Sequence, residues 1–245
     1  MLRRNLLLSA LAAPAILRAG AAFAAHPVDV ELVLAVDVSR SVDAEEMEMQ
    51  MRGYAAFRDP RLAAAMMRGP IGAVAVTLFT WSDWNIQEHL VPWTRLDGPA
   101  ACAAFAHAID AAPRRTHLYT SISGAIDYAV RLFGQGFEGT RRVVDISGDG
   151  INNSGRDLTA AREEAIGQGV ILNGLAVLDR SPPPPGLGPA QPLEEYYQQR
   201  VIGGPGAFLM VAEGFESFEQ AVRRKVIREV ALDAPPGPPV EHAFA

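Results

Sequence analysis

The chain has 245 residues, of which 49% are hydrophobic and 20% are charged, and its formal net charge at pH 7 is −6. This composition is typical of a folded domain with a sizeable core. The acidic balance excludes a protein that binds nucleic acid or anionic lipid through its overall charge. The single cysteine, Cys102, excludes an intrachain disulfide, and its alanine-rich, helix-like surroundings predict a buried packing residue.

The N-terminal segment, residues 1–25, has the layout of a secretory signal peptide. Two arginines precede an apolar stretch, which ends in the small residues "AFAA" at the expected cleavage site. The sequence "RRNLL" also resembles a twin-arginine export signal. A membrane anchor is the alternative, but Pro14 and Arg18 interrupt the apolar stretch and leave it short of the ~20 residues of a bilayer span. We therefore expect an exported protein of the bacterial periplasm, with no membrane span in its mature chain.

Residues 26–232 are predicted to form one domain in which apolar strands alternate with helices. The expected strands cover residues 28–36, 71–80, 88–94, 141–148, 170–178 and 206–212. The expected helices cover residues 43–67, 97–111, 121–133, 156–168 and 217–232. This alternation predicts an α/β fold, with a doubly wound, mostly parallel sheet and helices on both faces. Pro92 favours an edge position for residues 88–94, as one short antiparallel strand.

Three features depart from this regular pattern. The sequence "RSPPPPGLGPAQP" (residues 180–192) predicts a proline-rich loop, because proline is excluded from helix interiors and central strands. The sequence "DAPPGPPVEHAFA" (residues 233–245) predicts a disordered tail. Asp145 lies inside a predicted strand, where a carboxylate needs hydrogen bonds or solvent. We expect it to have a structural role.

Oxygen-bearing side chains gather in three loops that follow or lie between the predicted strands. Ligands bind to open parallel sheets beyond the carboxyl ends of the strands, where the strand order reverses. The candidate donors at this edge are Asp37, Ser39, Ser41, Asp149 and either Thr116 or Thr120. Such a set suits a hard divalent cation, Mg²⁺ or alternatively Mn²⁺ or Ca²⁺, and it contains no cysteine or histidine for zinc.

The same loops resemble those of von Willebrand factor A domains. "DVSRS" (residues 37–41) is similar to the Asp-x-Ser-x-Ser signature of their metal-ion-dependent adhesion site, or MIDAS. "TSISGAIDYA" is similar to the second loop of that site and favours Thr120 over Thr116, and "VVDISGDG" is similar to the third loop, with Asp149. Gly148 is a departure, because many members have Thr-Asp-Gly there. "LEEYYQQRVIGGPGAF" and "GFESFEQAVRRK" also resemble an uncharacterised proteobacterial group of exported domains of this type.

The resemblance implies a Rossmann-like fold and a function in adhesion or assembly without catalysis. It implies that Ser39, Ser41 and Thr120 touch the ion directly, while Asp37 and Asp149 hold it mainly through water. An Asp or Glu of a partner protein would complete the coordination, and hydroxyl ligands would leave the ion able to attract that acid. Loop residues around the ion are then expected to contact the partner, namely Arg40, Trp81, Trp84 and Asn152. For the two tryptophans, an aromatic cluster at the edge of the core is the alternative.

Two other functions compete with this interpretation. Haloacid dehalogenase-type phosphatases use an aspartate after the first strand as nucleophile, here Asp37, and "SGDGINN" resembles their acidic motif. Ser39, however, stands where they need a second carboxylate, and Asn153 replaces the last acid of the motif. These enzymes also need a cation to hold the phosphoryl group, but the only lysine, Lys225, lies far downstream. One of four arginines would have to replace it, namely Arg114, Arg115, Arg141 or Arg142. The second alternative is a metal-free structural domain, because Asp and Ser are ordinary turn residues and Thr is an ordinary helix cap.

Overall fold

The structure, a computed structural model, describes residues 25–39, 42, 44–178, 191–231 and 239–244. Residues 1–24 of the expected signal peptide, Arg40, Ser41 and most of the proline-rich loop lie outside the described residues. Within those ranges, no helix combines the length and the apolar character that crossing a membrane requires.

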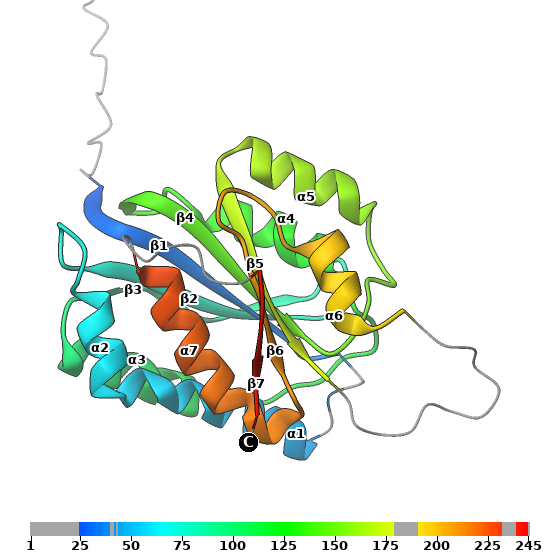
Figure 1. The fold of residues 1–245 in the computed structure, drawn as a ribbon, viewed down its shortest axis with the longest axis horizontal. Helices are drawn as coiled ribbons and strands as arrows, with labels where there is room; N and C mark the ends of the chain where they lie inside the picture. Colours follow the sequence, from blue (N-terminus) through cyan, green and yellow to red (C-terminus); the bar gives the residue numbers. More distant parts are fainter. Residues whose placement is uncertain (1–24, 40–41, 43, 179–190, 232–238, 245) are drawn as a thin grey trace, which may run out of the picture.

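Seven strands form a single sheet in the order β3-β2-β1-β4-β5-β6-β7 (Figure 1). Their bounds are β1 (His26–Asp37), β2 (Val74–Trp81), β3 (Gln87–Leu96), β4 (Phe137–Gly148), β5 (Val170–Val177), β6 (Leu209–Ala212) and β7 (Val240–Ala243). The pairing of β2 with β3 is antiparallel, and the other pairings between these strands are parallel. The predicted α/β fold with an antiparallel edge strand is therefore confirmed.

Helices cover both faces of the sheet (Figure 1). One face carries α1 (Ala44–Gly53), α2 (Pro60–Met66), α3 (Pro99–Asp110) and α7 (Phe218–Val230), and the other carries α4 (Ile122–Leu132), α5 (Leu158–Gly167) and α6 (Leu193–Tyr196). The central strand β1 alternates between them. Leu32 and Leu34 belong to the core of the first face, whereas Val33 and Ala35 belong to the core of the second. Because β2 and β4 lie on opposite sides of β1, the strand order reverses at the end of β1, where Asp37 stands.

The predicted single helix over residues 43–67 is wrong, since α1 and α2 are separate helices. A 3₁₀ turn (Tyr54–Arg58) follows α1, and Asp59 is extended, with φ −67° and ψ 126°. Pro60 causes this break, because a proline disfavours the helical conformation of the residue before it but fits the first turn of a new helix. The Asp59 carboxylate then caps α2 by accepting a hydrogen bond from the Arg61 amide at 2.7 Å.

The prediction of a disordered tail is wrong for residues 240–243, which form β7. This strand pairs in parallel with β6 and so covers an edge that would otherwise expose unpaired backbone groups. Arg228 and Arg224 of α7 hold Glu241 of β7, with N–O distances of 2.5 and 3.3 Å. The strand has only four residues, two of them polar, and lies beyond a proline-rich segment, so the sequence has no periodic pattern long enough to predict it.

A buried charged network ties α7 to the middle of the sheet. Lys225 is fully buried, its Nζ lies 2.7 Å from Asp145 Oδ1, and it also pairs with Glu229. The Asn173 side chain of β5 donates to Glu229 Oε1 at 3.0 Å and accepts from the Phe208 amide at 3.1 Å. The structural role expected for Asp145 is thus confirmed. Burial raises the pKa of Glu229 to about 7 and also raises the pKa of Asp145, while Lys225 opposes both shifts.

Replacing the buried cation tests this network. We expect Lys225→Met to lower the free energy of unfolding by about 3–5 kcal/mol near pH 8, because two buried carboxylates lose their counter-charge. The loss should be smaller near pH 5, since acids with raised pKa values take up protons in the folded state and then need no cation. Urea denaturation of both proteins at both pH values measures the difference.

Arg224→Met is the matched control for Lys225→Met. It lies on the same helix, but its side chain is 45% exposed and its ion pair with Glu241 is in contact with solvent, so the substitution should cost less than about 1 kcal/mol at either pH. Equal losses for Lys225→Met at the two pH values would contradict the assigned coupling between Lys225 and the two carboxylates.

Candidate metal site

Three loops meet at the carboxyl ends of β1 and β4. Asp37 is the last residue of β1, and Thr120 precedes α4. The third loop runs from Gly148, the last residue of β4, to Gly150. A Cβ atom added to Gly148 would lie 2.8 Å from Asp37 Oδ2, and one added to Gly150 would lie 3.4 Å from Thr120 Oγ1. The third loop therefore lies against both of the other two. Asp149 is close enough for its charge to raise the pKa of Asp37.

The Asp37 carboxylate is fully buried and only half satisfied. Its Oδ1 accepts a hydrogen bond from the Ser39 amide at 2.8 Å, whereas its Oδ2 is buried with no hydrogen-bond partner among the described residues. Burial, and then the charge of Asp149, raise the pKa of Asp37 well above its usual range, although hydrogen bonds from Ser39 and from the Val38 backbone oppose the shift. A buried carboxylate with an unsatisfied oxygen is costly unless a proton or a cation joins it. The residues present therefore fit a divalent cation at this position.

Thr120 is held in place by the residues that follow the third loop. Its amide donates to Asn153 Oδ1 at 2.9 Å, and the Asn153 amide donates to Thr120 O at 2.8 Å. Thr120 is not the cap of α4, because the Ser121 side chain accepts from the Gly124 amide instead. This removes the capping interpretation of Thr120. Thr116, in contrast, is exposed and lines a separate cavity.

The residues that were predicted to contact a partner differ in their exposure and in their contacts. Trp81 belongs to β2 and is fully buried, so the prediction that it contacts a partner is wrong. Trp84, three residues later, is 62% exposed. The Asn152 side chain holds the loops together, because its Oδ1 accepts from the Ser123 amide at 3.0 Å and its Nδ2 donates to Ser154 O at 3.1 Å.

Two tyrosines from a distant segment complete the surroundings of the third loop, and the sequence did not reveal them. Tyr197 begins a π-helical turn (Tyr197–Val201), is fully buried, and has a hydroxyl that finds no hydrogen-bond partner in the described part of the chain. That hydroxyl would lie 2.7 Å from a Cβ on Gly148, on the side where Asp37 Oδ2 also lies. Tyr196 Oη accepts from the Asn152 amide at 3.2 Å. Both tyrosines thus lie against the segment that follows β4, and π-helical turns are frequent at functional sites.

Gly148 is required by this close packing, which makes it a test of the site's geometry. We expect Gly148→Ala to lower the free energy of unfolding by about 1–3 kcal/mol, because its methyl group would overlap Tyr197 Oη and Asp37 Oδ2. Adding Tyr197→Phe should restore part of the loss by removing the nearer atom. Denaturant unfolding without added metal measures both effects.

Gly167→Ala provides the control for Gly148→Ala. A Cβ atom there would meet no atom within 4 Å, so stability should be unchanged or rise by up to about 1 kcal/mol. A Gly148→Ala protein as stable as the parent would show that the third loop does not lie as close to Asp37 as described.

Comparison with protein-family profiles gives a match over most of the chain. The sequence profile of a family described as "Protein of unknown function (DUF1194)" matches residues 27–234. No curated protein matches the chain.

Solved structures establish the fold of the chain as that of von Willebrand factor A domains. Proximal thread matrix protein 1 from the mussel byssus, with a zinc-occupied MIDAS motif, has 16% identity and a TM-score of 0.56, over 83% of this chain and 46% of that one. A von Willebrand factor type A protein from Catenulispora acidiphila has 14% identity and a TM-score of 0.56, over 83% and 43%. BatB from Bacteroides thetaiotaomicron has 18% identity and a TM-score of 0.51, over 82% and 98%. The chain thus spans less than half of the first two proteins.

Proposed function

We propose that this chain, which belongs to the DUF1194 family, binds a partner protein through a divalent cation held at the candidate metal site. The observation that carries the proposal is the Oδ2 atom of Asp37, a buried carboxylate oxygen that has no hydrogen-bond partner among the described residues. It lies against the third loop, which also contacts Thr120 and contains Asp149. A cation and the water bound to it would satisfy this oxygen, and the charge of the ion would offset the repulsion between the two carboxylates.

The proposed roles follow from the type of each side chain. The hydroxyls of Ser39, Ser41 and Thr120 would contact the ion directly, and Asp37 and Asp149 would hold it mainly through water. The bound ion would supply a positive centre that accepts a carboxylate oxygen from an Asp or Glu of the partner. We propose Mg²⁺ as the ion, with Mn²⁺ or Ca²⁺ as alternatives. The zinc reported for the MIDAS motif of the mussel protein makes zinc a further ion to titrate.

We further propose that the protein is exported. The signal-peptide pattern of residues 1–25 supports this, and β1 begins at His26, directly after the expected cleavage site. Cleavage there would remove no residue of the sheet. Intact mass measurement of the protein recovered from a periplasmic fraction should give a chain that begins near Ala25 or His26, and a full-length mass would contradict export by cleavage.

We propose a binding function without catalysis. A phosphatase built on Asp37 would need a cation to hold the phosphoryl group, but Lys225 is buried on the face of the sheet that carries α7, in ion pairs with Asp145 and Glu229. Asn153, at the end of the acidic motif, is engaged with Thr120. We therefore expect no turnover of p-nitrophenyl phosphate in Mg²⁺ above that of Asp37→Asn, and Asp37-dependent turnover would favour the phosphatase instead.

Metal-dependent stability tests the ion site. We expect Mg²⁺ at a hundredfold excess over its dissociation constant to raise the Tm of the mature chain by about 5–10 °C relative to chelator. Asp37→Asn should abolish this gain. In chelator near pH 8 the variant should be at least as stable as the parent, since the raised pKa of Asp37 makes its ionisation in the folded state costly. Calorimetry and thermal scans give the two readouts.

Asp29→Asn is the matched control, because Asp29 is a buried carboxylate on the same strand. Its oxygens accept hydrogen bonds from the amides of residues 71–73, at 2.8–3.3 Å. The substitution should therefore lower stability equally with and without Mg²⁺ and leave metal binding intact. If none of the four cations binds the parent, or if Asp37→Asn binds as well as the parent does, the proposed function is wrong.

A further inference from the structure

Exposed apolar side chains gather beside the candidate metal site. Six large hydrophobic side chains are exposed in the described part of the chain, and four of them belong to the loops at this edge of the sheet. These four, which we call the apolar rim, are Trp84 (62% exposed), Leu118 (66%), Tyr119 (53%) and Ile151 (52%). Single exposed hydrophobic residues are ordinary, but a group of them marks an interaction surface.

The loops that carry the rim are tied to one another and to the metal site. Leu118 and Tyr119 directly precede Thr120, and Ile151 directly follows Gly150, which lies against the Thr120 side chain. The turn with Trp84 joins the same cluster, because the Ser121 amide donates to Ser82 O at 2.6 Å and the Ser82 hydroxyl donates to Tyr119 O. The rim residues therefore come from three loops that are joined to one another, and two of these loops also carry Thr120 and Asp149.

The backbone beneath Trp84 is fixed, although its ring is exposed. The Ser82 amide donates to Ile86 O at 3.1 Å, the Ile86 amide donates to Asp83 O at 3.0 Å, and the Gln87 side chain donates to Trp84 O at 3.2 Å. A Cβ on Gly124 would come within 2.9 Å of Trp84 Cα, so the turn is packed tightly on α4. A tryptophan on a rigid support loses little conformational entropy on binding, and such residues are frequent interface anchors.

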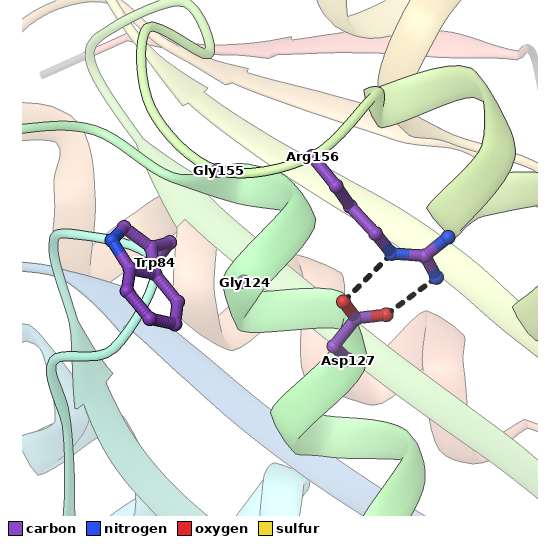
Figure 2. A pocket seen from close by; sticks show the side chains of 5 residues that line it. All are labelled: Trp84, Gly124, Asp127, Gly155 and Arg156. Carbon is purple, nitrogen blue, oxygen red and sulfur yellow. Dashed lines mark hydrogen bonds and ion pairs between the residues drawn. The ribbon is translucent and has the colours of Figure 1, made fainter.

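A cavity of about 550 Å³ lies beside the Trp84 ring, lined by Trp84, Gly124, Asp127, Gly155 and Arg156. Figure 2 shows the ring on one side and the Arg156–Asp127 ion pair on the other, with the two glycines between them. Arg156 donates to both Asp127 oxygens, at 2.7 and 2.8 Å, and also pairs with Glu164, so its charge is already neutralised. The cavity therefore suits an apolar side chain better than a charged one.

A second cavity, of about 470 Å³, lies along the same turn. It is lined by Asp83, Ile86 and residues 116–119, which include two side chains of the rim. The turn that carries Trp84 thus lines both cavities, through Trp84 in the first and through Asp83 and Ile86 in the second.

We propose that the apolar rim and these two cavities bind a partner protein whose metal-binding Asp or Glu is flanked by aromatic or aliphatic side chains. The proposal rests on the proposed function, because the rim is continuous with the metal site. Charge supports it as well. Without residues 1–24 the chain keeps 19 basic and 28 acidic residues, a net charge of −9, which repels an acidic partner. An uncharged rim adds no further repulsion, and its burial supplies affinity beyond a single carboxylate–metal contact.

A peptide selection tests the chemistry of the partner. The probe is a phage-displayed library of random peptides with a fixed central aspartate, selected on the mature chain in Mg²⁺. We expect enrichment of Trp, Phe, Tyr, Leu or Ile within a few positions of the aspartate. Enrichment of acids with polar or charged neighbours, or enrichment of no sequence, would overturn the proposal.

Affinities of the selected peptides then test the rim itself by fluorescence anisotropy. Trp84→Ala should weaken binding by about tenfold or more, whereas Met67→Ala, an exposed apolar residue beyond α2, should change it less than about twofold. Unchanged Tm and unchanged Mg²⁺ affinity in Trp84→Ala would show that the fold and the ion site are intact. Binding that is equal for Trp84→Ala and the parent overturns the rim proposal.

Measurements in chelator and on the Asp37→Asn variant distinguish a wrong rim proposal from a wrong ion site. Both changes should abolish peptide binding, and so should replacement of the peptide's aspartate by asparagine. If Mg²⁺ binds but Trp84→Ala has no effect on the peptides, the proposed function stands and the rim proposal fails. If the peptides bind equally in chelator, the link between rim and ion is wrong. A concentration-dependent dimer that is lost in Trp84→Ala would assign the rim to a second copy of the chain and overturn the proposed partner.

Discussion

The burial of the Asp37 carboxylate at the end of the central strand is the constraint on which the surrounding loops depend. One oxygen is satisfied by the Ser39 amide, whereas the other faces Gly148 and the Tyr197 hydroxyl without a hydrogen bond from the described residues. Any side chain at position 148 would overlap these atoms. The glycine that departs from the usual third-loop sequence is therefore what allows this loop to approach β1 and to contact Thr120 at the same time.

The same sheet contains two other buried aspartates, and each has partners that offset its charge, although Asp145 Oδ1, which lies 2.7 Å from Lys225 Nζ, makes no hydrogen bond within the described residues. Asp29, near the start of β1, accepts three backbone hydrogen bonds, and Asp145 of β4 has the counter-charge of Lys225. Burial by itself is thus not a sign of function in this protein. The distinction of Asp37 is that its environment is incomplete while a second acid, Asp149, stands nearby. An incomplete buried acid in a set of hydroxyl-bearing loops is the arrangement that a cation would complete.

The sequence predicted the features that depend on hydrophobic periodicity, but not those that depend on contacts between residues far apart in the chain. Alternating apolar strands and helices were sufficient for the fold, because a parallel sheet needs helical crossovers. The local sequence does not distinguish Trp81 from Trp84. Trp81 is buried because it is the last residue of β2, whereas Trp84 lies in the turn beyond the strand and is exposed. Tyr197 reaches Gly148 across about fifty residues of sequence, so spacing gave no signal for it. The helix break at Pro60, in contrast, follows from a local rule, because a proline disfavours the helical conformation of the residue before it.

A metal ion and an apolar rim would contribute to partner binding in different ways. Any accessible carboxylate can approach a cation, so coordination alone discriminates poorly between partners. Apolar contacts around the ion would exclude water on binding, which both selects the flanking side chains and strengthens the attraction between ion and carboxylate by lowering the local dielectric. The exposed surface that this requires is a liability in the free protein. In the free protein this surface is divided among three loops, with Trp84 and Tyr119 on separate ones.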